Sequence, residues 1–557
     1  MTRRLTHGTK FTPNNVEQYT PTRNCASENS HLRLSRLLAT RSPRFNRACV
    51  SNGELASYAM RSAPIDLPAD KFREAGHRLI DDVADFLSGI AEHQVAPGLS
   101  PAEVRALLPK GGLPDSGADP ATLLREVTEL LFSKSTLNGH PRFFGYITSS
   151  PAPLGILADL LASAVNPNVG AWSLSPVATE IERQAIAWIA ELVGYPAGCG
   201  GLFVSGGNMA NIVALIAARS ARLPGNVRAR GVTADGQRPV IYASAEAHTW
   251  VQKAADMTGL GSDAVHLVKV DDRQAMNLHD LRETITRDRA SGFTPFIVIG
   301  TAGTTATGAV DPLGEIAELC REEKLWFHVD GAYGAPAARV PGAPPELAAL
   351  SLADSIAVDP HKWLYSPLEA GCVLLRDRRL LPGAFSYHPS YYHFGEIDGE
   401  EPVNFYEWGP QNSRGFRALK VWLGMRQVGR DGALRMIADD ISLARRFFEA
   451  AGAHPEIDAV TCSLSIVTLA YAPEELRARS GEPEVFAYLN ELNEALLTAM
   501  VDGGEAYLSN AVIDGRYLMR ACIVNFRTDT GDVEAIPEII TRIGQSIDRE
   551  RRPAKLR

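Results

Sequence analysis

Seven short apolar runs between residues 201 and 375, separated by turns and helical stretches, constrain the fold of this chain most. Their length suits buried strands and is too short for helices. Strands that alternate with helices form a mainly parallel sheet with helices on both faces. The sequence therefore predicts an α/β fold. The expected strands are 201–204, 240–243, 264–270, 295–299, 325–329, 355–358 and 371–375.

Helices are predicted before this sheet and an α+β unit after it. Apolar residues recur at helical spacing in 70–93 and 119–132, and Asp119 suits an N-cap before Pro120. Two further helices are expected within 154–193, and a long one from Arg414 to about Gln427, followed by two or three strands and more helices. A chain of 557 residues exceeds one compact domain. The expected divisions are a basic tail or misassigned start (1–65), a helical segment (66–150), a large domain (151–430) and a small α+β domain (431–557).

The first 60 residues differ from the rest because they carry nine Lys or Arg residues, only three acids, and many Ser, Thr and Asn. One interpretation is an organelle transit peptide, which would be rich in arginine and poor in acids. Others are a disordered tail, or a misassigned start with translation beginning at Met60. No apolar core of a secretory signal is visible.

Charge and cysteine content exclude several classes of protein. The net charge of −9 gives no support for binding nucleic acid or an anionic membrane. No apolar run approaches the roughly 18 residues of a membrane span. The seven cysteines are odd in number and contain no CxxC pair. We therefore expect neither a disulfide framework nor a metal site, and a reduced cytoplasm fits best.

Two residues at predicted strand ends can carry chemistry. Lys362 lies in the stretch 359–363 (Asp-Pro-His-Lys-Trp), and ligands bind at the carboxyl ends of strands in α/β sheets. Such a lysine can condense with an aldehyde cofactor if its amine is accessible, although most lysines are surface charges. Asp330 follows the buried strand 325–329, where a carboxylate needs a partner. The pyridinium nitrogen of pyridoxal phosphate (PLP) would suit it, while an N-cap for the following segment is the alternative.

Other strand ends add weaker signals. In 201–219, a Ser-Gly-Gly-Asn turn separates a strand from an apolar helix, so backbone N–H groups at the helix start could hold a phosphate. The turn has neither the lysine of a P-loop nor a GxGxxG pattern, which disfavours a nucleotide. His248 could stack on a cofactor ring, although a lone histidine is more often a structural hydrogen bonder. Residues 301–305 place threonine hydroxyls at another strand end.

Together these motifs resemble the group II PLP-dependent decarboxylases, which include the aromatic-L-amino-acid, histidine and glutamate decarboxylases. The matching elements are SGGN, His248, GTAGTT at 300–305, HVDGAYG at 328–334 and DPHKW at 359–363, in the same order and spacing, over about Asp66 to the C-terminus. The resemblance implies a fold-type I PLP enzyme with a helical N-terminal segment, a large α/β domain and a small α+β domain. It also implies a homodimer with shared active sites.

The same resemblance implies roles for individual residues. Lys362 would hold PLP as a Schiff base, and Asp330 would pair with the pyridine nitrogen. His248 would stack on one face of the ring and Ala332 on the other. The remaining expected positions are Gly207, Asn208 and His361 around the phosphate, Thr304 near the ring, and His328 near the reacting centre.

Asp359 departs from the pattern, because the animal aromatic decarboxylases have asparagine there, beside the phosphate. A carboxylate would repel a phosphate. We therefore expect Asp359 to point elsewhere, to accept hydrogen bonds from backbone donors, or to act through a water.

The resemblance implies a mobile catalytic loop within 387–411. It is long and carries several tyrosines, and long loops in compact domains are usually functional or disordered. The resemblance aligns Tyr391 with a tyrosine that protonates the substrate's Cα from the neighbouring subunit. Relatives that oxidise the amine to an aldehyde have phenylalanine there, so Tyr391 favours plain decarboxylation. The alternative interpretation is a plain surface loop.

The substrate is less constrained. The resemblance implies a pocket lined by Tyr146, Ile147 and 168–172, which includes Asn168, Gly170 and Trp172. We expect Gly170 to enlarge this pocket and Asn168 to add a polar contact. Ser413 corresponds to a position where plant relatives with phenolic substrates have serine. No arginine is placed for a second carboxylate, so tyrosine, DOPA, phenylalanine or tryptophan is favoured over glutamate or aspartate.

Two competing interpretations remain at this point. A PLP lyase or aminotransferase of the same fold type would also use an aspartate and a lysine to hold PLP. It would lack the combination of the HVD and DPHKW motifs with a tyrosine-containing loop. A non-catalytic relative that kept only the fold would be expected to lose Lys362 or Asp330, and both are present.

Overall fold

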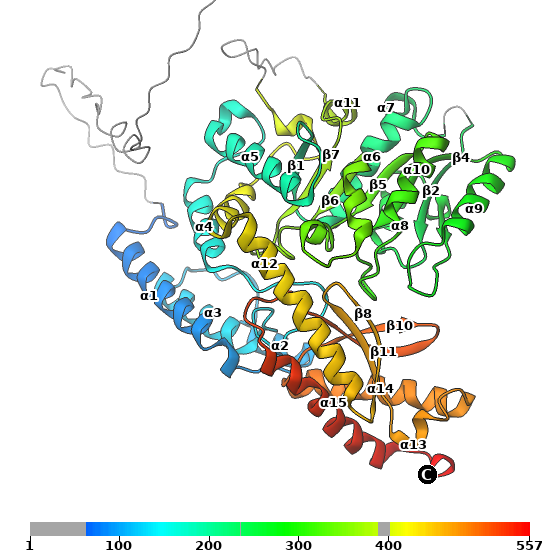
Figure 1. Ribbon diagram of the computed structural model, residues 1–557. Coiled ribbons are helices and arrows are strands. Elements are labelled where there is room, and N and C mark those ends of the chain that lie inside the picture. The colour runs from blue at the N-terminus through cyan, green and yellow to red at the C-terminus, as the bar shows by residue number, and fades with distance from the viewer. Residues whose placement is uncertain (1–62, 234–235, 388–401) are drawn as a thin grey trace, which may run out of the picture. The chain divides into compact units, whose positions relative to one another are not determined.

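The computed structural model describes residues 63–233, 236–387 and 402–557 (Figure 1). The chain divides at Pro68, and Ala69–Arg557 holds the structure described below. The expected tail therefore lies almost entirely outside the described residues. Tyr391 also lies outside them.

A seven-stranded sheet of order β1-β7-β6-β5-β4-β2-β3 forms the centre of the large unit. Neighbours β3, β2, β4, β5 and β6 pair in parallel, and β7 is antiparallel to both β6 and β1. The predicted, mainly parallel α/β fold is confirmed, with β7 reversed. The strands are β1 Gly200–Val204, β2 Pro239–Ser244, β3 Val265–Val268, β4 Thr294–Thr301, β5 Trp326–Asp330, β6 Ser355–Val358 and β7 Gly371–Leu375.

Helices cover both faces of this sheet, as Figure 1 shows. On one face, α6 and α8 contact the side chain of His328 on β5, while on the other α10 packs against β4 beside Phe327. The helices between the strands are α6 Gly207–Arg222, α7 Val227–Arg230, α8 Trp250–Met257, α9 Leu278–Ala290, α10 Leu313–Glu323 and, after β7, α11 Leu380–Phe385.

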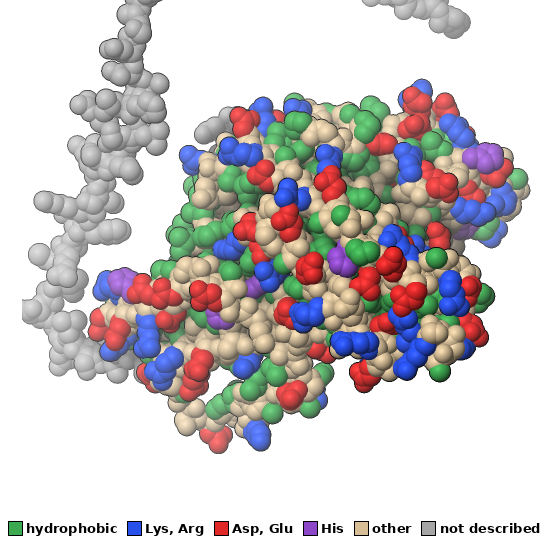
Figure 2. Space-filling view, turned by 60° about the horizontal axis from the view of Figure 1, so that its bottom comes forward, with side chains coloured by type: hydrophobic (Ala, Val, Ile, Leu, Met, Phe, Trp, Pro, Cys, Tyr) green, Lys and Arg blue, Asp and Glu red, His purple; other side chains and the backbone are tan. Residues whose placement is uncertain are grey.

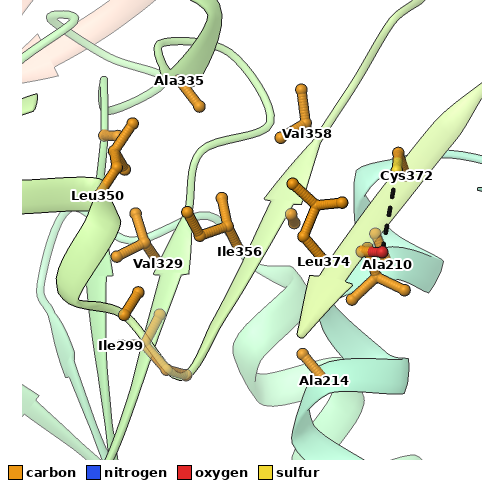
Figure 3. Packing of buried hydrophobic residues seen from close by; sticks show 14 of the residues in the cluster. Ala210, Ala214, Ile299, Val329, Ala335, Leu350, Ile356, Val358, Cys372 and Leu374 are labelled. Atoms are coloured by element: carbon orange, nitrogen blue, oxygen red, sulfur yellow. Dashed lines mark hydrogen bonds between the residues drawn. The ribbon is translucent and has the colours of Figure 1, made fainter. Parts of the chain in front are cut away.

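The core of the sheet is built from branched aliphatic side chains. Figure 3 shows Val329 and Ile356 from the adjacent strands β5 and β6, with Ile299 of β4 nearby and Ala210 and Ala214 of α6 close to the strand that carries Leu374. All of these residues are essentially inaccessible to solvent. The small alanines let α6 approach the strands closely, which fixes the position of the helix start at Gly207.

The N-terminal part is helical, as expected. Its helices are α1 Ala69–Ser88, α2 Pro101–Leu107, α3 Pro120–Lys134, α4 Pro153–Val165 and α5 Pro176–Val193. Asp119 caps α3 by accepting a hydrogen bond from the backbone N–H of Thr122, as its sequence context predicted. The first predicted helix is shorter than expected, because α1 ends at Ser88 and a 3-10 turn, Ile90–Glu92, follows.

The C-terminal part contains a second, antiparallel sheet of order β10-β11-β9-β8. Its four strands exceed the two or three predicted. The helix expected from Arg414 to about Gln427 begins at Ala418 and continues to Ala453 through a non-helical Gly429 at φ 66°. Glycine adopts this conformation readily, and it bends the helix instead of ending it. The remaining elements are α12 Ala418–Ala453, β8 Ile457–Ser463, β9 Ile466–Tyr471, α13 Glu474–Arg477, α14 Pro483–Gly503, β10 Ser509–Ile513, β11 Arg516–Cys522 and α15 Thr530–Arg551.

The surface in Figure 2 carries Lys and Arg side chains interspersed with Asp and Glu. This face therefore presents no field of a single sign that would attract a polyanion. Within the described ranges, no helix combines the length and the apolar character that crossing a bilayer requires.

Candidate active site

The carboxyl ends of β1, β5 and β6 meet in one cradle. Gly207 begins α6 just after β1, and a Cβ atom added to it would lie 2.7 Å from Oδ2 of Asp359 and 2.9 Å from Cβ of Ala332. The backbone N–H of Asp359 donates to the carbonyl of Ala332 at 3.1 Å. Three of the motifs found in the sequence are thus in contact, and His361 also lies 3.3 Å from the Cβ position of Gly206.

Asp330 ends β5 with its carboxylate fixed by two donors. The indole N–H of Trp250 donates to Oδ2 at 2.7 Å, and the backbone N–H of Ala332 donates to Oδ1 at 3.2 Å. Both bonds fix the orientation of the carboxylate in a largely buried position. Trp250 was not singled out in the sequence. Its only signal was its place two residues after His248, to which its backbone N–H also donates.

Lys362 lies on the same cradle, with its side chain 19% exposed and its Nζ 3.4 Å from Oδ2 of Asp359. Hydrogen bonds hold the loop that carries it at both ends. The N–H of Lys362 donates to the carbonyl of Asp359, and its own carbonyl accepts from the N–H of Tyr365. Ser149 donates its hydroxyl to the carbonyl of His361 at 2.7 Å, which ties the segment that includes Tyr146 and Ile147 to this loop.

One of our expectations was that Asp359 points away from the phosphate site. The structure shows instead that its side chain lies in the cradle. Its side chain is 3% exposed and faces the ammonium of Lys362 and Nε2 of His361, the latter at 3.6 Å. Oδ2 lies beside Gly207, and Oδ1 is buried without a hydrogen-bond partner. Burial lowers the pKa of His361, and the negative charge of Asp359 opposes this shift. The carboxylate therefore favours a positive charge on His361.

The start of α6 fits a phosphate. No side chain caps this helix, and its N-cap Gly206 and first residue Gly207 leave the backbone open on the side of Asp359. The N–H groups of a first helical turn have no partner within the helix and attract anions. Asn208 is exposed beside them. Because a side chain at Gly207 would fill the cradle, the glycine is required by the close approach.

The other two predicted site histidines lie in different environments. His248 is exposed, its Nδ1 accepts from the N–H of Trp250, and burial by neighbouring groups lowers its pKa against the opposing charge of Asp330. His328 is inaccessible to solvent, with Nδ1 2.8 Å from the hydroxyl of Ser355 and Nε2 2.7 Å from Oδ1 of Asn211. Burial lowers the pKa of His328 to about 4, so the ring is neutral. The structure does not bring His328 to the open side of the cradle.

Of the two smaller residues expected at the ring, Ala332 contacts the cradle and Thr304 does not. Ala332 is 6% exposed and lies against the Gly207 position. Thr304 is fully buried, and its hydroxyl interacts with that of Thr307 at 2.9 Å and accepts from the N–H of Ala309. The hydroxyl of Thr304 is therefore occupied within its own turn.

Gly170 does not enlarge a pocket, which corrects our expectation. A Cβ atom there would lie 2.4 Å from the carbonyl oxygen of Asn412, so the glycine is needed for backbone packing. Asn168 likewise stabilises this segment, because its Oδ1 accepts from the N–H groups of Gly170 and Arg414. Arg414 is buried in an ion pair with Glu182 and donates to the carbonyl of Val169.

The remaining residues expected to line the substrate pocket lie in different places. Tyr146 is 61% exposed, near the Lys362 loop, and Ile147 is partly buried against the core. Trp172 donates from its indole N–H to Glu180 and lines a cavity of about 800 Å³ beside α5 and β1. Among the other predicted site residues, none that the structure describes lines that cavity. Ser413 is exposed.

Arg520 is a charged residue of this region that the sequence did not reveal. It lies on β11, only 2% exposed, and donates through Nη1 to the carbonyl of Tyr146 at 2.9 Å and to the hydroxyl of Ser509. Its Nε and Nη2 are buried without hydrogen-bond partners. A buried guanidinium with unused N–H groups fits a carboxylate. The alternation of β11 gave no sign of this role, because a strand arginine is usually exposed.

These residues fit PLP. Lys362 provides the amine for the aldehyde, Asp330 a fixed carboxylate for a pyridinium nitrogen, and the glycine-lined start of α6 the N–H groups for a phosphate. Each group stands at the carboxyl end of a strand or just after it, on the same edge of the sheet, so one molecule could reach all three.

Known proteins match this arrangement over most of the chain. The family described as pyridoxal-dependent decarboxylase conserved domain matches residues 101–468. The aromatic-L-amino-acid decarboxylase of Bacillus atrophaeus is 33% identical, covering 87% of this chain and 98% of that protein. Tyrosine decarboxylase 4 of Petroselinum crispum is 29% identical, covering 85% and 93%. The crystal structure of Oryza sativa TDC with PLP and tryptamine superimposes with a TM-score of 0.80 at 26% identity, covering 87% of this chain and all of that one. The chain therefore belongs to the family of pyridoxal-dependent decarboxylases.

Proposed function

We propose that this enzyme uses PLP to convert an aromatic L-amino acid (tyrosine, DOPA, phenylalanine or tryptophan) to its amine and CO2. The observation that carries the proposal is the placement of Lys362 and Asp330 on one glycine-lined cradle in a chain of this family. The aromatic substrate class is supported by the names of the relatives, which include an aromatic-L-amino-acid decarboxylase and a tyrosine decarboxylase.

In this proposal, bound PLP supplies an electron sink for the charge left on the substrate's Cα when CO2 departs. Lys362 would hold the cofactor through its side-chain amine. Asp330, fixed by Trp250 and Ala332, would keep a proton on the pyridine nitrogen. His248 and Ala332 would lie beside the ring, and Gly207, Asn208 and His361 would hold the phosphate. We keep Thr304 and His328 as supporting residues behind the cradle.

The final proton transfer is assigned to Tyr391, which would protonate Cα from the loop of the neighbouring subunit. This residue lies outside the described ranges, and its role rests on the sequence resemblance. Tyr146, Ile147 and Trp172 are proposed to line the side-chain pocket, whereas Gly170 contributes only through the backbone packing described above.

We further propose that Arg520 binds the carboxylate of the substrate, because it is a buried cation with two unused N–H-bearing nitrogens. Replacing Arg520 with lysine is expected to raise KM about 10- to 100-fold, the value of one or two charge-assisted hydrogen bonds. The matched control is Arg516→Lys on the same strand, whose partner is Asp458. Steady-state kinetics on both variants test this role, and an unchanged KM in Arg520→Lys would contradict it.

We also propose that the enzyme is a homodimer with active sites at the interface. Helices α1 and α3 bury no residue in the single chain and expose apolar side chains, among them Phe72, Val127 and Leu131 at 63, 50 and 53%. Such apolar faces mark association surfaces. Light scattering coupled to size exclusion should give twice the mass of one chain at micromolar concentration. A single-chain mass would contradict the proposal.

The domain divisions 66–150, 151–430 and 431–557 are part of this proposal. Two separate sheets support it, since β1–β7 lie within 200–375 and β8–β11 within 457–522. Two distinct buried clusters, one around each sheet, support it as well. Helix α12 spans the proposed boundary, and its bend at Gly429 falls next to it.

We propose a cytoplasmic location. The five cysteines in the described part of the chain are all unpaired, three of them buried. Free thiols persist in a reducing compartment, which the cytoplasm provides.

The proposed function is tested by incubating the PLP-loaded protein with each of the twenty amino acids, DOPA and 5-hydroxytryptophan. We expect CO2 and an equal amount of amine from an aromatic substrate. Peroxide with an aldehyde would show that Tyr391 does not act as proposed. Ammonia or a keto acid without CO2 would favour a lyase or aminotransferase reaction instead.

A further inference from the structure

We infer that Asp440, on the second half of α12, is a positioning residue that holds the loop of Lys362 in place. This inference rests on the proposed function of Lys362. No motif pointed to Asp440, and it lies outside the cradle. Its side chain accepts hydrogen bonds from Trp363 and Tyr365, which follow Lys362 in the same loop.

The contacts are direct and short. Oδ2 of Asp440 accepts from the indole N–H of Trp363 at 2.9 Å and from the hydroxyl of Tyr365 at 2.6 Å. Trp363 and Tyr365 are 0 and 3% exposed, and Asp440 is 2% exposed, so no solvent can replace these bonds. One carboxylate oxygen therefore fixes two side chains of the loop at once.

A second contact holds Trp363 through the face of its ring. The ring of Tyr333 stacks on it with a centroid separation of 4.6 Å, and the hydroxyl of Tyr333 interacts with that of Ser465 at 2.7 Å. Tyr333 belongs to the HVDGAYG motif that also contains Asp330. The loop of Lys362 is thus held by contacts with the segment after β5 and with α12, and the turn before β9 supports the first of these.

Keeping a carboxylate in this place is costly, which argues that it serves a purpose. Burial raises the pKa of Asp440 to about 7, and neighbouring Asp439 adds to the shift, while the donors of Tyr365, Trp363 and the backbone of Asn525 oppose it. A well-packed apolar residue is often the more stable choice for a buried position. It would, however, leave the N–H of Trp363 and the O–H of Tyr365 buried without an acceptor.

The consequence for the chemistry follows from the spacing. Lys362 directly precedes Trp363, and its Nζ lies 3.4 Å from Asp359 only while the loop keeps its shape. A displacement of about 1 Å in a reacting group can cost about a hundredfold in rate. Loss of the Asp440 anchor should therefore weaken covalent binding of PLP and lower kcat, with KM for the amino acid little changed.

The test compares Asp440→Asn with the matched control Asp439→Asn, an exposed neighbour on the same helix. PLP is removed from the full-length protein and titrated back, and Kd and the absorbance of the Lys362-bound cofactor are recorded. We expect Asp440→Asn, whose amide oxygen can accept only neutral hydrogen bonds, to weaken PLP binding about tenfold, the difference between charge-assisted and neutral hydrogen bonds, and to shift the absorbance. The control should bind PLP as the unaltered enzyme does.

A double-mutant cycle separates positioning from a general loss of stability. Tyr365→Phe removes one donor and keeps the ring, so the variant should fold. If Asp440 acts through the loop, Tyr365→Phe should weaken PLP binding in the unaltered enzyme and do so much less in the Asp440→Asn background. Additive effects, or an unchanged Kd and absorbance in Asp440→Asn, would overturn the inference. Because the readout is PLP binding, an enzyme that binds PLP through Lys362 but releases no CO2 would refute the proposed function alone.

Discussion

Replacing Lys362 with alanine is expected to lower decarboxylation at least about a thousandfold and to abolish covalent attachment of PLP. Two effects combine. The amine that forms the Schiff base is lost, and the carboxylate of Asp359 loses the cation 3.4 Å away in a position that is 3% exposed. An unpaired buried carboxylate next to a phosphate site should also weaken PLP binding.

The measurement is the absorbance of the protein after incubation with PLP and dialysis, together with CO2 release from the best substrate. The unaltered enzyme should remain yellow, and the variant should be colourless. Lys253→Ala is the matched control, because Lys253 is an exposed lysine on α8 near the same site. If the Lys362 variant stayed yellow and active, another lysine would hold the cofactor and the assignment of the site would be wrong.

Replacing Asp330 with asparagine is expected to lower kcat about 100- to 1000-fold, the scale on which one fixed electrostatic contact acts. Asparagine has nearly the same shape, so the variant isolates the charge. A neutral amide cannot hold a proton on the pyridine nitrogen, and the ring then accepts electrons less well. PLP should still attach to Lys362, because the amine and the phosphate cradle are unchanged.

The control for this variant is Asp311→Asn. Asp311 is also fully buried, and its carboxylate accepts from the backbone N–H groups of Met276 and Thr301 at 2.7 Å each. Neutralising it should lower the melting temperature and leave kcat within a few-fold. Steady-state kinetics and thermal melting of both variants distinguish the cases. A kcat in Asp330→Asn close to that of the unaltered enzyme would refute the proposed pairing with PLP.

The sheet could be predicted well because its signal is local. Each buried strand is a short apolar run bounded by turn residues, and all seven expected runs overlap the observed strands. The predicted end of the long helix was wrong for a local reason too. Gly429 interrupts the helical pattern, but the chain resumes a helix after it because Ala433, Ile437 and Ile441 pack into the core.

The motifs of the cradle could also be located from the sequence, because glycine, lysine and aspartate stand directly after strands. Parallel strands bring their carboxyl ends to one edge, so residues far apart in the chain were expected to meet. The residues that contact the motif residues or their loops from distant parts of the chain could not be located in this way. Trp250 lies 80 residues from Asp330, Asp440 lies 75 from Tyr365, and Arg520 lies 374 from Tyr146.

The sequence by itself determined the fold class, the order of the strands along the chain and the motifs that form the cradle, since all of these depend on patterns within a few residues. The tertiary structure decided which of those side chains are free to act. It placed Asp359 in the cradle, occupied both nitrogens of His328, and filled the space beside Gly170 with the backbone of Asn412. Such outcomes depend on close packing and on the pairing of every buried polar group, and the partners come from distant parts of the chain.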